Sequence, residues 1–107
     1  MQRVWRVEDA RGDGPYQQSE KLRRAFGDPE WDIVSHRRPR HGSMLPVNGR
    51  YVFVSKRELL DWFDVKTLKK LIFLGYKVRS YLVAQVVTGD RQGFVREEVW
   101  CERTNRR

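Results

Sequence analysis

Residues 51–87 read YVFVSKRELLDWFDVKTLKKLIFLGYKVRSYLVAQVV, and this stretch decides the fold. Its first four residues are β-branched or aromatic, which favours a strand. Ser55 and Glu58 follow with the spacing of a capping box, in which the Ser55 side chain accepts from the Glu58 backbone amide and the Glu58 side chain returns the bond. The sequence therefore predicts a strand that turns directly into a capped helix.

Two helices are expected between Ser55 and Gly75, because Asp64 can cap a second one and glycine suits the left-handed position after a helix end. Residues 76–87 then predict one long strand, and the apolar residues on both faces of its second half predict a central place in the sheet. The second helix should turn Leu68, Leu71 and Ile72 to one face and Lys66, Lys69 and Lys70 largely to the other.

The flanking segments add three elements. Residues 4–7 predict a first strand, and Ser19 a helix that ends at Gly27. Residues 93–101 predict a last strand, on which Cys101 would be a buried thiol beside Trp100. The order favours an α+β fold: a single small domain with a twisted, mainly antiparallel sheet and two or three helices packed against it.

The chain has 107 residues and a net charge of +8. We expect one domain over residues 1–102, with a basic loop at 36–50 and a basic tail at 103–107. Loop and tail lack acidic residues and hold seven arginines, which account for almost all of the net charge. Such segments bind phosphates or an acidic protein face, or keep a small domain soluble.

Several classes of function have little support. No apolar run approaches a membrane span, residues 1–6 lack the apolar centre of a secretory signal, and a single cysteine forms no intramolecular disulfide. A soluble, cytoplasmic protein is therefore expected. His36 and His41 lie between arginines, which oppose a divalent cation, so no metal site is predicted. No G-x-S-x-G or P-loop pattern is present.

The chain resembles a group of small phage-encoded proteins of uncharacterised role. The matching segments are Val4-Trp5-Arg6-Val7-Glu8, Gly14-Pro15-Tyr16, Val52-Phe53-Val54-Ser55, Leu59, Leu60, Trp62, Phe63, Gly75-Tyr76, Tyr81-Leu82-Val83, Gly89-Asp90-Arg91-Gln92 and Phe94.

The same layout is similar to a minimal ADP-ribosyltransferase-type fold. That resemblance implies NAD as cofactor and three site residues: Arg6 (or Arg3) for the phosphates, Ser55 for the ribose, and Gln92 (or Glu97) for the positive charge that develops at the anomeric carbon. No Glu-x-Glu or Gln-x-Glu pair follows, since Gly93 and Phe94 come after Gln92. Ser55 also has a sufficient structural role as a helix cap.

The leading hypothesis is a phage-type protein without enzymatic activity or cofactor, which binds and inhibits or redirects a host bacterial protein with an acidic face. Expected targets are a defence complex, a transcription component or a motor ATPase such as the one that assembles type IV pili. Nucleic-acid binding is the other alternative, based on the arginines. The residues expected to bind the partner are Trp31, His36, Arg37, Arg38, Arg40, His41 and Met44.

Overall fold

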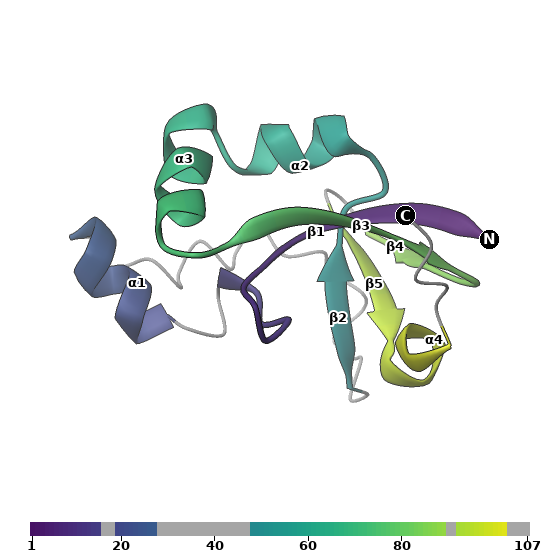
Figure 1. The fold of residues 1–107 in the computed structure, drawn as a ribbon. Coiled ribbons are helices and arrows are strands. Elements are labelled where there is room, and N and C mark those ends of the chain that lie inside the picture. The colour runs from purple at the N-terminus through teal and green to yellow at the C-terminus, as the bar shows by residue number, and fades with distance from the viewer. Residues whose placement is uncertain (16–18, 28–47, 90–91, 103–107) are drawn as a thin grey trace.

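The computed structural model describes residues 1–15, 19–27, 48–89 and 92–102. These residues form a compact α+β domain with antiparallel pairing, as the sequence predicts (Figure 1). The elements are β1 (Gln2–Glu8), α1 (Ser19–Phe26), β2 (Gly49–Val52), α2 (Lys56–Trp62), α3 (Val65–Phe73), β3 (Lys77–Val83), β4 (Val87–Thr88), β5 (Gly93–Arg96) and α4 (Glu97–Cys101).

The strands form two sheets that meet at a single point. Strand β1 pairs with β3, and a second sheet has the order β2-β5-β4. Trp5 of β1 and Phe53, the residue after β2, exchange backbone hydrogen bonds of 2.8 and 2.7 Å. This bridge holds the start of the chain against the stretch that leads into α2.

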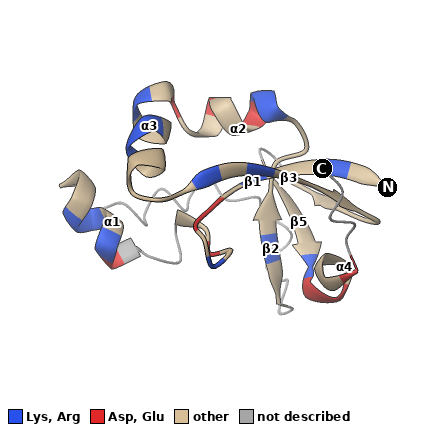
Figure 2. Ribbon diagram, in the orientation of Figure 1, with Lys and Arg blue, Asp and Glu red and all other residues tan. Residues whose placement is uncertain are grey.

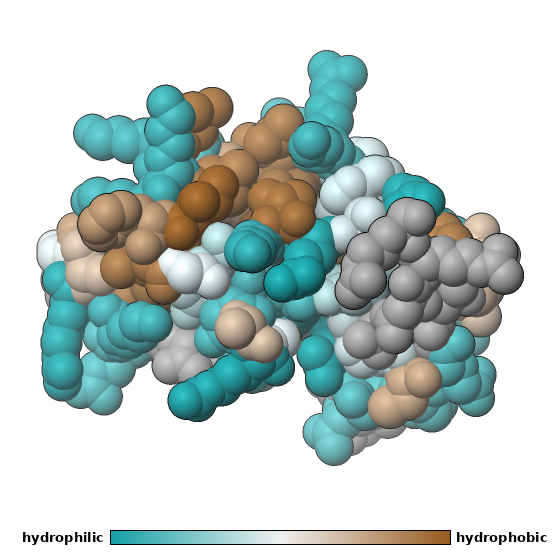
Figure 3. Space-filling model, in the orientation of Figure 1, coloured by the Kyte–Doolittle hydropathy of each residue, from teal (hydrophilic) through white to brown (hydrophobic). Residues whose placement is uncertain are grey.

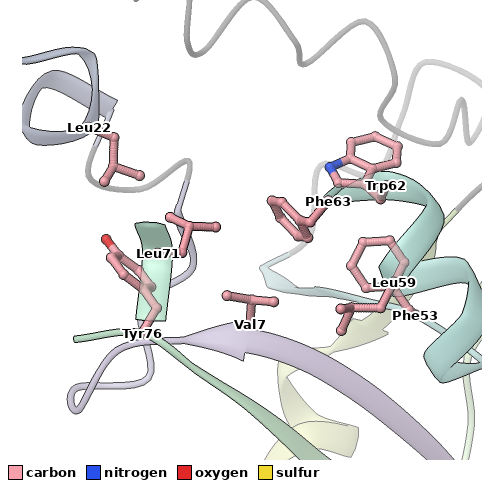
Figure 4. Close-up of a cluster of buried hydrophobic side chains, with 8 residues drawn as sticks. All are labelled: Val7, Leu22, Phe53, Leu59, Trp62, Phe63, Leu71 and Tyr76. Carbon is pink, nitrogen blue, oxygen red and sulfur yellow. The ribbon is translucent and has the colours of Figure 1, made fainter. Parts of the chain in front are cut away.

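Two hydrophobic clusters stabilise the domain. The larger one lies among α1, α2, α3 and β1, and Figure 4 shows its side chains: Val7, Leu22, Phe53, Leu59, Trp62, Phe63, Leu71 and Tyr76. The smaller one joins the sheets to α4 through Val4, Val52, Val83, Val95 and Trp100. Helices α2 and α3 lie along one side of β1 and β3 (Figure 1).

The helix boundaries follow the local signals in the sequence. The Ser55 side chain accepts a hydrogen bond from the Glu58 amide at 3.1 Å, and Asp64 accepts one from the Thr67 amide at 2.7 Å. Gly75 has a φ of 101°, a backbone conformation that residues with a Cβ atom rarely adopt. The prediction of two capped helices is confirmed.

The prediction of one long central strand is wrong. Strand β3 ends at Val83, and within the described part of the chain it pairs with β1 alone. Ala84 and Gln85 are exposed, and the chain then enters the short strand β4. Val83, at the end of β3, lies in the smaller core, and Val86, just before β4, packs against it, which explains the apolar residues at both positions.

The predicted last strand is also too long. It ends at Arg96, and residues 97–101 form α4, whose first turn places Glu97 and Glu98 at the positive end of the helix dipole. Trp100 is buried, but Cys101 is exposed and free, which corrects the expected buried thiol.

Candidate functional site

A cavity of about 350 Å³ opens between β1, the turn that follows it and the start of β2. Its lining combines apolar, aromatic and charged side chains from segments far apart in the sequence. Among the described residues it is lined by Arg6, Val7, Gly12, Asp13, Gly14, Pro15, Asn48, Gly49, Arg50, Tyr51, Phe53, Phe63, Gln92 and Glu97. A volume of this size lies within the usual range for small-molecule sites.

The Arg6 guanidinium is held on the cavity wall by three hydrogen bonds. Its Nε donates to Glu8 Oε1 at 3.1 Å, Nη1 to the Tyr51 carbonyl at 2.9 Å and Nη2 to the Gly12 carbonyl at 3.0 Å. Burial lowers the pKa of Arg6, and the Glu8 carboxylate opposes that shift. Arg6 therefore ties β1, β2 and the intervening turn together.

Glu8 is the centre of a buried polar network. It accepts from Arg6 and from the Tyr81 hydroxyl, and Arg79 lies 3.5 Å from its second carboxylate oxygen. Only 5% of Glu8 is exposed. Its negative charge is therefore balanced by guanidinium groups inside the fold, because an unpaired buried charge would destabilise it strongly.

Arg50 is held less tightly than Arg6. Its Nη1 donates to the same Gly12 carbonyl at 3.3 Å, its Nε lies 3.5 Å from Glu97, and its guanidinium lies 5.0 Å from the Trp100 ring centroid. Arg50 belongs to β2, so the part of the expected basic loop from Gly49 onward is strand rather than loop.

Gln92 differs from the other polar groups on the cavity wall. The residue is only 6% exposed, and its Oε1 has no hydrogen-bond partner among the described residues. A buried polar atom without a partner normally costs stability. Gln92 immediately precedes β5, and its backbone carbonyl accepts from Gly89 at 2.8 Å.

The structure brings together some of the residues that the transferase resemblance implied. Arg6, Gln92 and Glu97 all line the cavity. Ser55 is absent from the described cavity lining and caps α2 instead, as the sequence predicts. Arg3, the alternative to Arg6, is exposed and donates to Ser80 at 3.0 Å.

The residues expected to bind a partner lie outside the described residues, and the structure does not test them. They are Trp31, His36, Arg37, Arg38, Arg40, His41 and Met44. In the part of the chain that the structure covers, no three histidine, cysteine or acidic side chains gather as a metal site would require.

Sequence reasoning missed a second candidate surface, on the outer side of α2 and α3. Phe73 is 89% exposed, Val65 64%, Ile72 52% and Leu60 43%. The sequence prediction placed Ile72 on the same helix face as Leu71. In the structure Leu71 is buried and Ile72 is exposed, so the prediction is wrong for Ile72. The sequence does contain the spacing that indicates this face, since Val65 and Ile72 are seven residues apart and share a helix face with Lys69.

Basic side chains surround these apolar groups. Lys66, Lys69 and Lys70 are exposed on α3, and the helix appears largely blue in Figure 2. Figure 3 shows apolar groups gathered over α2 and α3, with hydrophilic side chains projecting beside them. We name this surface, made of Leu60, Val65, Lys66, Lys69, Ile72 and Phe73, the α2–α3 face.

The described residues form a small α+β domain with a cavity beside β1 and an exposed apolar face on α2 and α3. The family model described as Bacteriophage T4 Y00F protein matches residues 1–104. The chain therefore belongs to this phage protein family, which confirms the expected phage relationship.

Two further comparisons found nothing. No curated protein and no solved structure matches the chain, so the implied ADP-ribosyltransferase-like fold gains no support. None of the described helices is long and apolar enough to cross a membrane.

Proposed function

We propose that this phage protein binds a host bacterial protein and inhibits or redirects it. The observation that carries the proposal is the α2–α3 face, where Val65, Ile72 and Phe73 expose more than half of their surface. Large aromatic side chains near the centre of an interface supply much of its binding energy, while the surrounding contacts exclude water.

The lysines of this face define the chemistry of the partner. Lys66 and Lys69 flank the exposed apolar groups on α3. A matching surface would have an apolar pocket for Phe73 and carboxylates at its edge, because complementary charge accelerates association and rejects other partners. Arg37, Arg38 and Arg40 would extend the same complementarity to the rest of the acidic face.

We propose the partner's surface chemistry and the class of host protein to which it belongs. The proposed target is an acidic surface on a defence complex, a transcription component or a motor ATPase such as the one that assembles type IV pili, and covering that surface would change the activity of the target. The host cytoplasm is the compartment in which such an encounter would take place.

Affinity capture from bacterial lysate, followed by mass spectrometry and titration of the purified partner, tests the proposal. Phe73→Ser should weaken binding by about tenfold or more, since truncating a central aromatic anchor costs about 2 kcal/mol or more. The variant should fold normally because the side chain is exposed. A partner that binds wild type and Phe73→Ser equally would remove the α2–α3 face from the proposal.

A charge-matched pair of variants tests the lysines. Lys66→Ala with Lys69→Ala should slow association and reduce its dependence on salt. Arg3→Ala with Arg11→Ala removes the same charge from other exposed positions and should leave the association rate nearly unchanged. Equal slowing in both pairs would indicate attraction by net charge alone.

The second candidate function is a minimal transferase that uses NAD. The presence of Arg6, Gln92 and Glu97 on one cavity wall favours it. Transfer of labelled ADP-ribose from NAD to a host protein, with release of nicotinamide, would support this function if Gln92→Ala abolishes it. Transfer that survives Gln92→Ala, or no transfer at all, would count against it.

A further inference from the structure

We propose that the cavity beside β1 binds an uncharged, flat heterocycle that carries an N–H donor, of the nucleobase class. This inference concerns a different surface from the α2–α3 face and does not depend on the proposed protein partner. It follows from three properties of the cavity wall: an acceptor without a partner, balanced charge and an aromatic lining.

The unpaired acceptor is Gln92 Oε1. Gln92 lines the cavity, and its Oε1 is buried without a hydrogen-bond partner among the residues that the structure describes. A buried carbonyl oxygen without a hydrogen bond lowers the stability of the protein. A ligand N–H that donates to Gln92 Oε1 would supply the missing hydrogen bond. The amide of Gln92 also presents a donor beside the acceptor, which is the arrangement that recognises the edge of a base.

The charge on the wall favours an uncharged ligand. The ionisable acidic and basic side chains in the described lining are two guanidiniums, Arg6 and Arg50, and two carboxylates, Asp13 and Glu97. Arg6 is tied to Glu8, and Arg50 lies 3.5 Å from Glu97, so neither cation faces the cavity without a nearby carboxylate. A net anion would gain little here and would lose its hydration.

The shape of the wall favours a flat ring. Tyr51, Phe53 and Phe63 contribute to the lining. Aromatic side chains stack favourably on any of the nucleobases, because every base has a π-face. The cavity volume of about 350 Å³ gives room for a base with its sugar.

Two sources supply such a ligand: a free nucleoside, and an unstacked base of a single-stranded nucleic acid. The chemistry inside the cavity is the same for both. The net charge of +8 would hold the phosphates of a strand outside the cavity. The experiment therefore needs both kinds of probe.

Calorimetric titration of the full chain with adenosine, guanosine, cytidine and uridine, and with short homopolymers of the same bases, tests the proposal. At least one base should bind saturably, and Gln92→Met should weaken it about tenfold or more, because the base donor loses its acceptor. Binding to a homopolymer alone, weakened by the same variant, would support the nucleic-acid source.

The matched control is Gln85→Met, which makes the same change at an exposed position between β3 and β4. It should leave base binding unchanged. Gln92→Met should also melt at the same or a higher temperature than wild type without ligand, since it removes a buried acceptor that has no partner among the described residues. A structural role for Gln92 predicts the opposite shift.

Asn48→Trp provides a second variant that does not disturb the core, because Asn48 is exposed at the cavity. Its bulk should narrow the mouth and weaken the same base. Absence of binding to every nucleoside and homopolymer would overturn the proposal. Binding unaffected by both Gln92→Met and Asn48→Trp, or NAD bound more tightly than any nucleoside, would overturn it as well.

Discussion

The α2–α3 face and the interior beside β1 depart from the usual distribution of side chains in opposite directions. On the face, apolar groups meet solvent, with Phe73 89% exposed. Beside β1, polar groups are withdrawn from solvent, and Arg6, Glu8 and Gln92 are each at most 6% exposed. Exposed apolar groups and buried polar groups are the two observations that carry most information about function.

The two regions differ in how strongly a substitution there changes the free energy of unfolding. An exposed apolar side chain can be removed with little effect on folding, because it makes few contacts to lose. A buried charge depends on its partners, and removal of one partner leaves the other without compensation. Changes to the paired charges of Arg6 and Glu8 should therefore affect stability, and changes on the α2–α3 face should affect binding.

The largest effect is expected for Glu8→Ala. It leaves the buried Arg6 guanidinium without its carboxylate, and should lower the free energy of unfolding by about 3–5 kcal/mol. Denaturant unfolding measures the change. Tyr81→Phe removes only one donor to Glu8 and should cost about 1 kcal/mol. A cost for Glu8→Ala no larger than that of Tyr81→Phe would contradict the network.

A pair of substitutions two residues apart on α3 sharpens the comparison within one helix. Leu71 is fully buried, so Leu71→Ala should cost about 2–5 kcal/mol in unfolding free energy. Phe73→Ala should change stability by about 0.5 kcal/mol or less, since the ring is exposed. Comparable losses at both positions, measured by thermal and denaturant unfolding, would show that Phe73 packs against the fold.

Ser55→Ala should have a smaller effect. It removes the hydrogen bond to the Glu58 amide at the start of α2 and should cost about 1 kcal/mol. Asp64→Ala removes the equivalent cap of α3 and should cost a similar amount. Loss of an activity on NAD at unchanged stability would instead give Ser55 the ribose-orienting role.

The smallest effect at neutral pH is expected at Tyr76, whose buried hydroxyl has no partner among the described residues. Burial, and then Asp9 and Asp13, raise its pKa from 10.0 to about 12. The folded state therefore prefers the neutral hydroxyl, so this contribution to stability is complete below pH 10 and is lost as the pH rises through 12.

Tyr76→Phe should accordingly match wild type near neutral pH and lose less stability above pH 10. Denaturant midpoints of both proteins across this window measure the difference, and other titrating groups cancel in it. Identical alkaline slopes for the two proteins would contradict the raised pKa.

Much of the fold could be predicted because its signals are local. Ser55, Asp64 and Gly75 fix helix ends through contacts within a few residues, and the strand expected at residues 4–7 lies within β1. The end of β3 at Val83 and the change from β5 to helix at Glu97 were missed. After Val83 the chain stays largely apolar although the strand ends, and composition does not show this. At Glu97 a local signal was overlooked, because the acidic pair Glu97 and Glu98 favours the start of a helix.

The candidate site was less predictable. Resemblance pointed to Arg6, Gln92 and Glu97, and the structure places all three on one cavity wall. It could not indicate that Arg6 is tied to three acceptors or that Gln92 Oε1 is buried without a partner in the described part of the chain. Both facts depend on groups from distant segments.

The sequence by itself determined the capped helices, the glycine that ends α3 and the membership of a phage protein family, since each rests on residues near one another or on the pattern of the whole chain. Only the tertiary structure decided which apolar faces were covered and which polar groups were buried. The physical reason is that burial is a property of contacts between distant segments. Phe73 remains exposed because no described element covers it, whereas Gln92 is buried and lines the same cavity as residues of β2 and of the turn after β1.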